Sequence, residues 1–229
     1  FSESGTLKQI YDNVGGFFQN SNVYDNSVSI SGGHKNGSFY LSGSHYNQDG
    51  LVPTTGYEKT TFRFNGEQKY GKLTVGANVS YSKAHTDKTL TSGGLYGQGG
   101  NGAMTALYGW PLSDDVTHYL NEDGTKYRMF EGKQELASDV ENPYWMLDNY
   151  KMSDNTERFT GSFNVKADIT DWWWIGYRMG IDSYTTENSN RIGEGAAVKL
   201  LWQNGMLSEN SLRFQYLSTN LMTNFNKQF

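Results

Sequence analysis

Hydrophobic and polar residues alternate with a period of two in several segments of the chain. The clearest is residues 72–82, in which the odd positions carry Leu73, Val75, Ala77, Val79 and Tyr81, whereas polar or small residues fill the even positions. Successive side chains of a β-strand point to opposite faces. The pattern therefore predicts a strand with one apolar and one polar face.

The same alternation continues elsewhere in the chain. It occurs in residues 59–66, 158–168 and 172–182, and shorter runs at 26–32 and 38–47 are also typical of strands. The last segment, 212–226, changes parity between Tyr216 and Leu217, so we expect a β-bulge there. Together these segments predict an all-β, antiparallel fold.

The predicted connections between strands alternate between short and long. Tight turns at 34–37, 69–72 and 169–171 alternate with connections at 48–56, at about 85–154 and at 185–211. Outer-membrane barrels have short periplasmic turns and long extracellular loops, whereas long structureless loops are uncommon in compact soluble domains. We therefore interpret the sheet as a segment of a transmembrane β-barrel and residues 85–154 as a long extracellular loop.

Strand length and aromatic residues favour the same interpretation. Residues 73–81 have the length of the ~9–11 residues that cross a bilayer at a tilt. Residues 172–174 are three consecutive tryptophans that follow a short turn, where a periplasmic aromatic girdle is expected.

The low mean hydropathy of the chain is compatible with a membrane barrel and with a soluble protein. Of the 229 residues, 36% are hydrophobic and 15% aromatic, with 27 Gly and only 3 Pro, and the mean hydropathy is −0.68. Barrels have low hydropathy because only alternate residues face lipid. About seven strands are fewer than the eight of the smallest bacterial barrels, and open edges cannot face lipid. We therefore expect residues 1–229 to form part of one larger barrel domain.

Several other functions are disfavoured by residue types. The chain has no Cys, which excludes disulfides and thiolate sites, and its net charge of −5 argues against a nucleic-acid partner. The four histidines, at 34, 45, 85 and 118, show no metal-ligand spacing. No nucleophile-elbow motif is present. We expect no enzyme activity, no cofactor and no metal site.

Two features of the long loop could indicate a binding or catalytic site, but a purely structural explanation is stronger for both. The run GQGGNG at 97–102 matches the dinucleotide fingerprint, but it lies inside a long loop rather than between a strand and a helix. Asp114, Asp115, Glu122 and Asp123 could form an acid/base pair or a calcium cluster. A solvated loop explains both features better.

The two faces of the strands give the candidate residues of a channel wall. The polar positions predicted to face the lumen are Arg63, Asn65, Asn78, Asn164, Lys166, Arg178 and Asp182. The apolar positions predicted to face lipid are Leu73, Val75, Val79, Phe163, Trp173 and Ile175.

Aromatic residues in the long loop are candidates for binding a substrate or a partner protein. They include Tyr108, Trp110, Tyr144 and Trp145, and aromatic rings in a polar loop can stack on sugars or anchor a partner. The alternative is that they pack a small core of the loop itself. The sequence leaves both open, and it predicts a short helix at 102–109.

The order of these segments resembles the SusC/RagA family of TonB-dependent outer-membrane transporters. The run NSVSISGG at 26–33 resembles the family's "nslsisGG" strand, and SFYLSGS, YEKTTFRFN and LTVGANVSYS follow in the family's order. The match continues through Asn142-Pro143 and the hairpin 158–182. It covers roughly residues 12–184, with Lys59 where the family usually has Arg, and is weaker at 212–228.

The resemblance implies more than the residues themselves show. SusC-like proteins form barrels of about 22 strands closed by an N-terminal plug. They lie in the outer membrane of Gram-negative bacteria, carry a SusD-like surface lipoprotein as a lid, and import glycans or peptides with energy transmitted by TonB. The plug and the TonB-contacting segment are expected upstream of Phe1, and further strands downstream.

We therefore expect TonB-dependent import of a nutrient, an oligosaccharide first and a peptide as the alternative, by a protein that contacts outer-membrane lipid and a SusD-like lipoprotein. Two rivals remain open. One is a passive porin or adhesin barrel, which an upstream plug would exclude. The other is a secreted β-rich glycan-binding or glycan-hydrolysing domain, which would purify without detergent.

Overall fold

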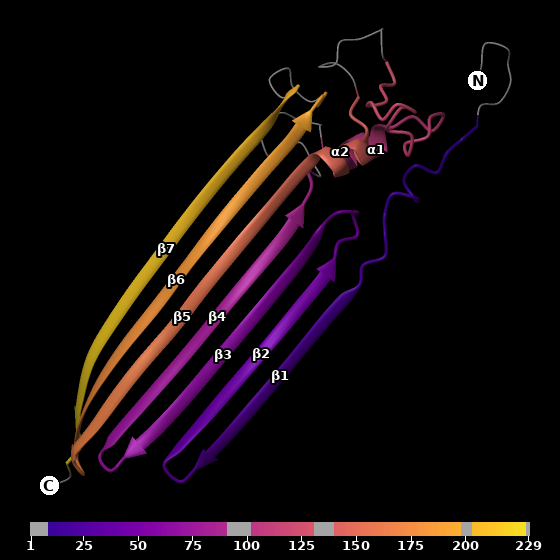
Figure 1. Cartoon of the computed structure of the whole chain (residues 1–229). Coiled ribbons are helices and arrows are strands. Elements are labelled where there is room, and N and C mark those ends of the chain that lie inside the picture. Colours follow the sequence, from indigo (N-terminus) through magenta and orange to yellow (C-terminus); the bar gives the residue numbers. More distant parts are fainter. Residues whose placement is uncertain (1–8, 91–101, 131–139, 198–202, 228–229) are drawn as a thin grey trace, which may run out of the picture.

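The computed structural model describes residues 9–90, 102–130, 140–197 and 203–227. Its main feature is one sheet of seven antiparallel strands arranged in chain order (Figure 1). The strands are β1 (Val23–His34), β2 (Gly37–Asp49), β3 (Gly56–Tyr70), β4 (Leu73–Lys88), β5 (Tyr150–Thr170), β6 (Trp173–Glu194) and β7 (Asn204–Phe225). Two short helices, α1 (Ala103–Gly109) and α2 (Pro143–Asn149), lie between β4 and β5. The predicted all-β, antiparallel fold is confirmed.

The strands are longer than the alternation predicts. Strand β4 continues to Lys88 and β5 begins at Tyr150, so the connection expected at 85–154 is residues 89–149. Strand β6 continues to Glu194 and β7 begins at Asn204, so most of the loop expected at 185–211 is strand. In these extensions cross-strand polar contacts replace apolar alternation. Examples are His85 with Asn155 at 2.7 Å and Asn188 with Asp154 at 2.6 Å.

Strand pairing aligns residues into rows that run across the whole sheet. One row is apolar except for a glycine: Ile30, Leu41, Phe64, Val79, Gly161, Ile181 and Leu217. The neighbouring row is polar except for a glycine: Ser31, Tyr40, Asn65, Asn78, Ser162, Gly180 and Ser218. A register slip of one residue would exchange the faces. The sheet therefore has one apolar and one polar face over its lower part.

The β-bulge expected between Tyr216 and Leu217 is wrong. Strand β7 pairs with β6 without a shift from Trp173–Phe225 to Ile192–Met206. The parity change arises because the apolar side chains in the upper part of β7 lie on the polar face of the sheet, where Phe214 pairs with Tyr184. The register shift that the pairing does show lies between Asp168 and Thr170 of β5.

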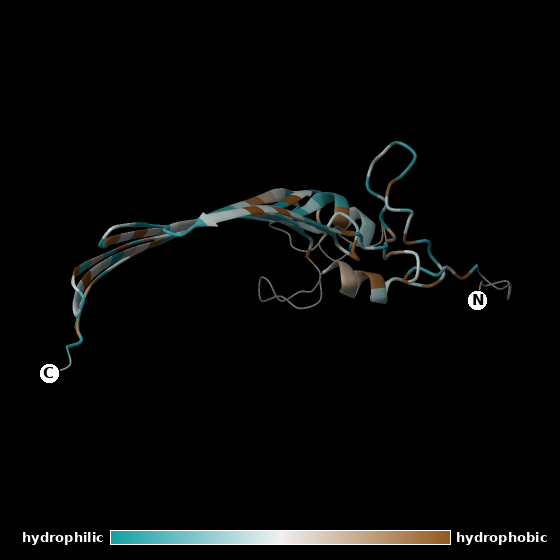
Figure 2. Cartoon of the chain, turned by 90° about the horizontal axis from the view of Figure 1, so that it is seen from below, coloured by the Kyte–Doolittle hydropathy of each residue, from teal (hydrophilic) through white to brown (hydrophobic). Residues whose placement is uncertain are grey.

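The described parts of the 89–149 connection fold into a small module at the upper end of the sheet. Its buried core includes Leu107, Trp110, Val116, Trp145 and Met146. The strands contribute Tyr150, Met152 and Ile192 to this core, and Met206 of β7 packs against it. Tyr150 and Met152 alternate in step with the polar positions of β5, so the module lies on the polar face. Figure 2 shows part of this module below the end of the curved sheet, on its concave side.

The segment before β1 is part of this module. Phe17 is buried in its core, and the Tyr11 backbone N–H donates to the carbonyl of Leu112 at 2.9 Å. Asn13 donates to the carbonyls of Pro111 and Asp114, and its Oδ1 accepts from the Val116 N–H at 3.1 Å. The segment is therefore fixed to residues about 100 positions away in sequence.

Asn142 organises the second helix of the module. Its Oδ1 accepts from the backbone N–H groups of Tyr144 and Trp145, which caps α2, and Pro143 occupies the first helical position. Its Nδ2 donates to the carbonyl of Val116 at 2.8 Å. Helix α1 begins one residue after Gly102, so the helix expected at 102–109 is confirmed.

A buried ion pair lies where the module meets the sheet. Lys126 pairs with Glu141, whose side chain is 5% exposed, and the Lys126 Nζ lies 3.9 Å from the centroid of the Trp145 ring. The other carboxylate oxygen of Glu141 accepts from the Tyr150 hydroxyl at 3.0 Å and from the Ala197 N–H at 2.7 Å. Burial and then the nearby carboxylate of Glu141 raise the pKa of Tyr150. Tyr150 thus remains a neutral hydrogen-bond donor.

Replacing Asn142 should destabilise the module without unfolding the sheet. Asn142→Ala removes the cap of α2 and leaves the buried Val116 carbonyl without its donor, at a cost of about 2–4 kcal/mol. Hydrogen exchange in the full-length protein should show faster exchange at residues 140–149 and unchanged exchange in β5. Leu112→Ala, at an exposed position in the same module, is the control. Equal exchange in the two variants would contradict the structural role of Asn142.

Candidate functional site

The polar face of the sheet carries all seven residues predicted to face the lumen. The register aligns Arg63 with Asp182 through Ser80 and Thr160, and it aligns Asn65 directly with Asn78. Asn164 pairs with Arg178, and Lys166 alternates in step with Asn164. The structure therefore brings these residues together on one surface. That the surface lines a lumen stays a prediction.

The opposite face carries the six residues predicted to face lipid. Val75 and Val79 lie on the same face of β4 as Ala77. Phe163 of β5 pairs with Ala77, and Val165 pairs with Val75, so these side chains share that face. Leu73 and Ile175 flank Ala167 in the next row. Trp173 stacks on Phe225 at the lower end, with ring centroids 5.4 Å apart. The face is thus a continuous apolar band.

The height of this band fits a membrane. Its upper border is a row of polar residues that includes the ion pair Lys83–Glu157, at 3.2 Å. From Ser183, one row below that border, to Trp173 is ten steps along β6, or roughly 33 Å of strand. At a tilt near 45° this covers about 23 Å, close to the ~25 Å of the apolar band of outer-membrane barrels.

The upper part of the polar face holds an aromatic and ionic group, of which only Asp182 was predicted from the sequence to lie on this face. Tyr184 and Phe214 stack with ring centroids 5.1 Å apart, and the Arg158 Cζ lies 5.8 Å from the Tyr184 ring centroid. Arg158 binds Asp182 through two hydrogen bonds, at 2.9 and 2.6 Å. Tyr216 pairs with Asp182 across the strands and is 58% exposed. We call Arg158, Asp182, Tyr184, Phe214 and Tyr216 the inner aromatic patch.

The signal for this patch was present in the sequence. The parity change at Tyr216–Leu217 marks the point at which apolar residues of β7 pass from one face to the other. Because the parity change was interpreted as a bulge, the prediction from the sequence did not place Phe214 and Tyr216 on the polar face. Only the pairing of β7 with Tyr184 distinguishes the two possibilities.

A second part of the polar face combines hydroxyl groups with two cations. Strands β1 to β3 form a shallow hollow there, lined by serines and by Tyr40, Tyr46, Tyr57, Lys59 and Arg63. The rings of Tyr46 and Tyr57 lie 5.9 Å apart. This surface can donate several hydrogen bonds to a polar molecule in contact with it and accept several from it.

The aromatic residues of the module fall into two groups. Trp110 and Trp145 are each only 4% exposed and belong to the core of the module. Tyr144 is partly buried, packs edge-on against Phe17 and donates its hydroxyl to the carbonyl of Gly16 at 3.2 Å. Tyr108 is 68% exposed. For Trp110 and Trp145 the structure favours core packing, whereas Tyr108 is available for contact.

Other chemistry considered from the sequence finds no assembled site in the described residues. No group of three or more His, Asp or Glu side chains there is arranged to hold a metal ion. Asp115 and Asp123 accept hydrogen bonds from Thr117 and Thr125 in local turns. Apart from Gly102, the residues of the 97–102 glycine run lie outside the described ranges. None of the described helices has the length and apolar character to cross a membrane.

Comparisons with known proteins give sequence relatives and structural neighbours. TonB-dependent receptor P26 of Formosa agariphila is 30% identical over 210 residues, which cover 84% of this chain and 19% of the relative. TonB-dependent receptor P3 of the same organism is 24% identical over 216 residues, 93% of this chain and 20% of the relative. The chain thus spans about a fifth of the length of these relatives. No protein-family model matches it.

Two solved structures share the fold. The RagAB peptide importer in its closed-closed state superimposes with a TM-score of 0.71 at 17% identity, over 96% of this chain and 24% of that one. The RagAB peptide transporter superimposes with a TM-score of 0.71 at 16% identity, over 94% of this chain and 23% of that one. The seven-stranded sheet therefore corresponds to part of a larger barrel.

The two-faced antiparallel sheet and these likenesses define a segment of an outer-membrane transporter barrel. The chain belongs to the TonB-dependent receptors, and its sheet has the fold seen in the RagAB structures. The expected resemblance is thereby confirmed.

Adjacent substitutions on the two faces should differ in their effect on barrel stability. Val79→Arg places a charge in the apolar band and should cost roughly 2–4 kcal/mol if it lies near the bilayer midplane. Asn78→Arg points to the polar face and should cost much less. Heat-modifiability of the full-length barrel on gels measures both. Equal losses would contradict the assignment of the faces.

Proposed function

We propose that this chain forms part of the wall of an outer-membrane importer that takes up an oligosaccharide with energy from TonB. The observation that carries this proposal is the division of the sheet into an apolar band of membrane height and a polar face with the inner aromatic patch. A passive porin would share the band. Similarity to TonB-dependent receptors favours the energised importer.

The positions of the module and the patch support a route for the substrate. The module lies on the polar face at the upper end of β5, at Tyr150 and Met152. Arg158 lies six residues farther down the same strand and alternates in step with Met152, so it is on the same face, roughly 20 Å away. A molecule entering past the module would therefore meet the inner aromatic patch next. In this arrangement residues 89–149 form an extracellular loop at the mouth.

The chemistry of the patch favours a sugar. The apolar C–H face of a sugar ring stacks on aromatic rings, and Tyr184 and Phe214 present a pair of them. The carboxylate of Asp182 and the guanidinium of Arg158 lie beside the rings and can bind hydroxyl groups as acceptor and donor. A peptide is the alternative substrate, because the RagAB neighbours are described as a peptide importer.

A surface lipoprotein of the SusD type is the proposed partner. The module exposes apolar side chains at its surface, including Tyr108 and Leu112, and exposed aromatic residues are common anchors of protein interfaces. The TonB contact would be made by a segment upstream of the residues present in this chain.

Uptake measurements on the full-length transporter test the proposal. Cells that lack the transporter should fail to take up a fluorescently labelled oligosaccharide mixture, and depletion of TonB should have the same effect. Phe214→Ala removes one ring of the platform and should raise the half-saturating concentration at least roughly tenfold. Leu217→Ala, on the apolar face of the same strand, should change it little.

Two results would contradict parts of this proposal. Uptake that persists without TonB would identify a passive barrel. Uptake of a labelled casein peptide digest in place of the oligosaccharides, with the same sensitivity to Phe214→Ala, would show that the substrate is a peptide. The proposed import function would stand.

Tyr108 and Trp110 should give different phenotypes. Tyr108→Ala removes an exposed ring and should weaken co-purification of the surface lipoprotein, by about 2 kcal/mol if Tyr108 is an anchor, with a normal amount of folded barrel. Trp110→Ala creates a cavity in the module and should destabilise it by about 3–5 kcal/mol. Limited proteolysis and quantitative pull-down separate the two effects. Normal lipoprotein recovery with Tyr108→Ala would remove Tyr108 from the interface.

A further inference from the structure

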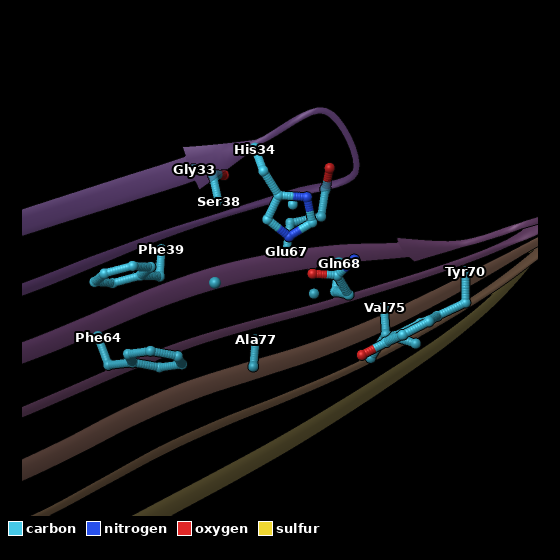
Figure 3. Close-up of a pocket in the computed structure, with 13 residues that line it drawn as sticks. Gly33, His34, Ser38, Phe39, Phe64, Glu67, Gln68, Tyr70, Val75 and Ala77 are labelled. Carbon is cyan, nitrogen blue, oxygen red and sulfur yellow. The ribbon is translucent and has the colours of Figure 1, made fainter.

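The apolar face contains a hollow near the short turns at the lower end of β2, β3 and β4. Its volume is about 620 Å³, within the ~300–1,000 Å³ typical of small-molecule sites. Phe39, Phe64, Val75 and Ala77 contribute apolar side chains to it, and Figure 3 shows these side chains around the hollow.

Two glycines explain why the surface is hollow there. The Phe39 ring lies over Gly32, where an added Cβ would come within 2.7 Å of the ring. The Phe64 ring lies over Gly66 in the same way, at 2.9 Å. Each ring therefore lies along the sheet instead of standing away from it. The small side chain of Ala77 leaves the surface between these rings and Tyr70 hollow, and this surface forms a groove.

The groove is apolar at one end and polar at the other. Phe39 and Phe64 lie toward the middle of the sheet, whereas His34, Gln68 and Tyr70 lie toward the turns (Figure 3). The His34 Nδ1 accepts a hydrogen bond from the Asn36 backbone N–H at 3.2 Å. A neutral His34 ring with this bond carries its proton on Nε2, which can donate to an anion.

The length of the groove matches one leaflet of a membrane. From Phe64 to Tyr70 is six steps along β3, or roughly 20 Å. At a strand tilt near 45° this covers about 14 Å of depth, close to half of the ~30 Å hydrocarbon core. The polar end would then lie at the headgroups beside the short turns, and the apolar end near the bilayer midplane.

We propose that this groove binds one glycerophospholipid of the leaflet on the side of the short turns. One acyl chain lies along Phe39, Phe64 and Ala77, and the phosphate accepts a hydrogen bond from the His34 Nε2. The single polar end and the one-leaflet length fit an amphiphile better than the sheet of a second copy. The inference rests on the membrane placement in the proposed function.

Native mass spectrometry of the full-length transporter in detergent tests this inference. Dioleoylphosphatidylethanolamine is added back to delipidated protein, and the bound fraction is measured. Ala77→Phe fills the floor of the groove and should lower the affinity roughly tenfold, since it displaces at least about two methylene groups of the chain. Ala167→Phe makes the same change on the apolar face outside the groove and should leave binding unchanged.

The outcomes separate the inference from the membrane placement. Equal lipid binding by both variants would overturn the site alone, whereas a protein that purifies without detergent would overturn the membrane placement. Loss of a dimer mass with Ala77→Phe would show a second copy in the groove and would also overturn the lipid site. If Ala77→Phe fails to form a heat-modifiable barrel, Ala77→Leu replaces it. His34→Ala should then weaken binding as well, and unchanged binding in both would refute the proposal.

Discussion

The structure depends on one constraint: backbone N–H and C=O groups in an apolar environment must be hydrogen-bonded within the protein. Strands β2 to β6 meet it by pairing with both of their sequence neighbours, and β1 and β7 pair along one edge each. Pairing fixes the register, and the register decides which side chains share a face. That is why Ile30 and Leu217, six strands apart, lie in one apolar row, while Ser31 and Ser218 lie in a polar row beside it. The division into two faces is thus a consequence of the ladder.

Above the apolar band the constraint relaxes, and the chain uses polar contacts in another way. The module at the upper end of the sheet is stabilised by buried side-chain hydrogen bonds as well as by apolar packing. Asn13 and Asn142 satisfy the N–H and C=O of Val116 from opposite sides. Glu141 connects Lys126, Tyr150 and the Ala197 N–H. Removing one member of such a network leaves its partners unsatisfied, so the module should hold one conformation relative to β5 and β6.

The sequence was sufficient to predict the strands whose two faces have different surroundings, because there hydrophobic and polar residues alternate. Residues 73–81 show it most clearly, and the assignment of Val79 and Asn78 to opposite faces follows from it. Alternation fails above the band because the face that continues the apolar band becomes polar there, which is why the ends of β5 and β6, with Asp154 and Glu187, were predicted to be loop. Trp110 and Trp145 are buried in a core that also includes Phe17, which is distant in sequence. The Asn142-Pro143 pair is a helix-start signal that could have indicated α2.

The inner aromatic patch and the core of the module use aromatic residues for different purposes. Trp110 and Trp145 are enclosed on all sides, which suits a rigid support. Tyr184 and Phe214 stack on each other, but Phe214 and Tyr216 keep much of their surface open. A transport path must bind its substrate firmly enough to admit it and weakly enough to release it. For the proposed sugar substrate, an open platform with a single ion pair beside it would meet that requirement better than a deep pocket, because only one face of a sugar ring would be bound at a time. The openness of the patch is therefore itself a property expected of a channel wall.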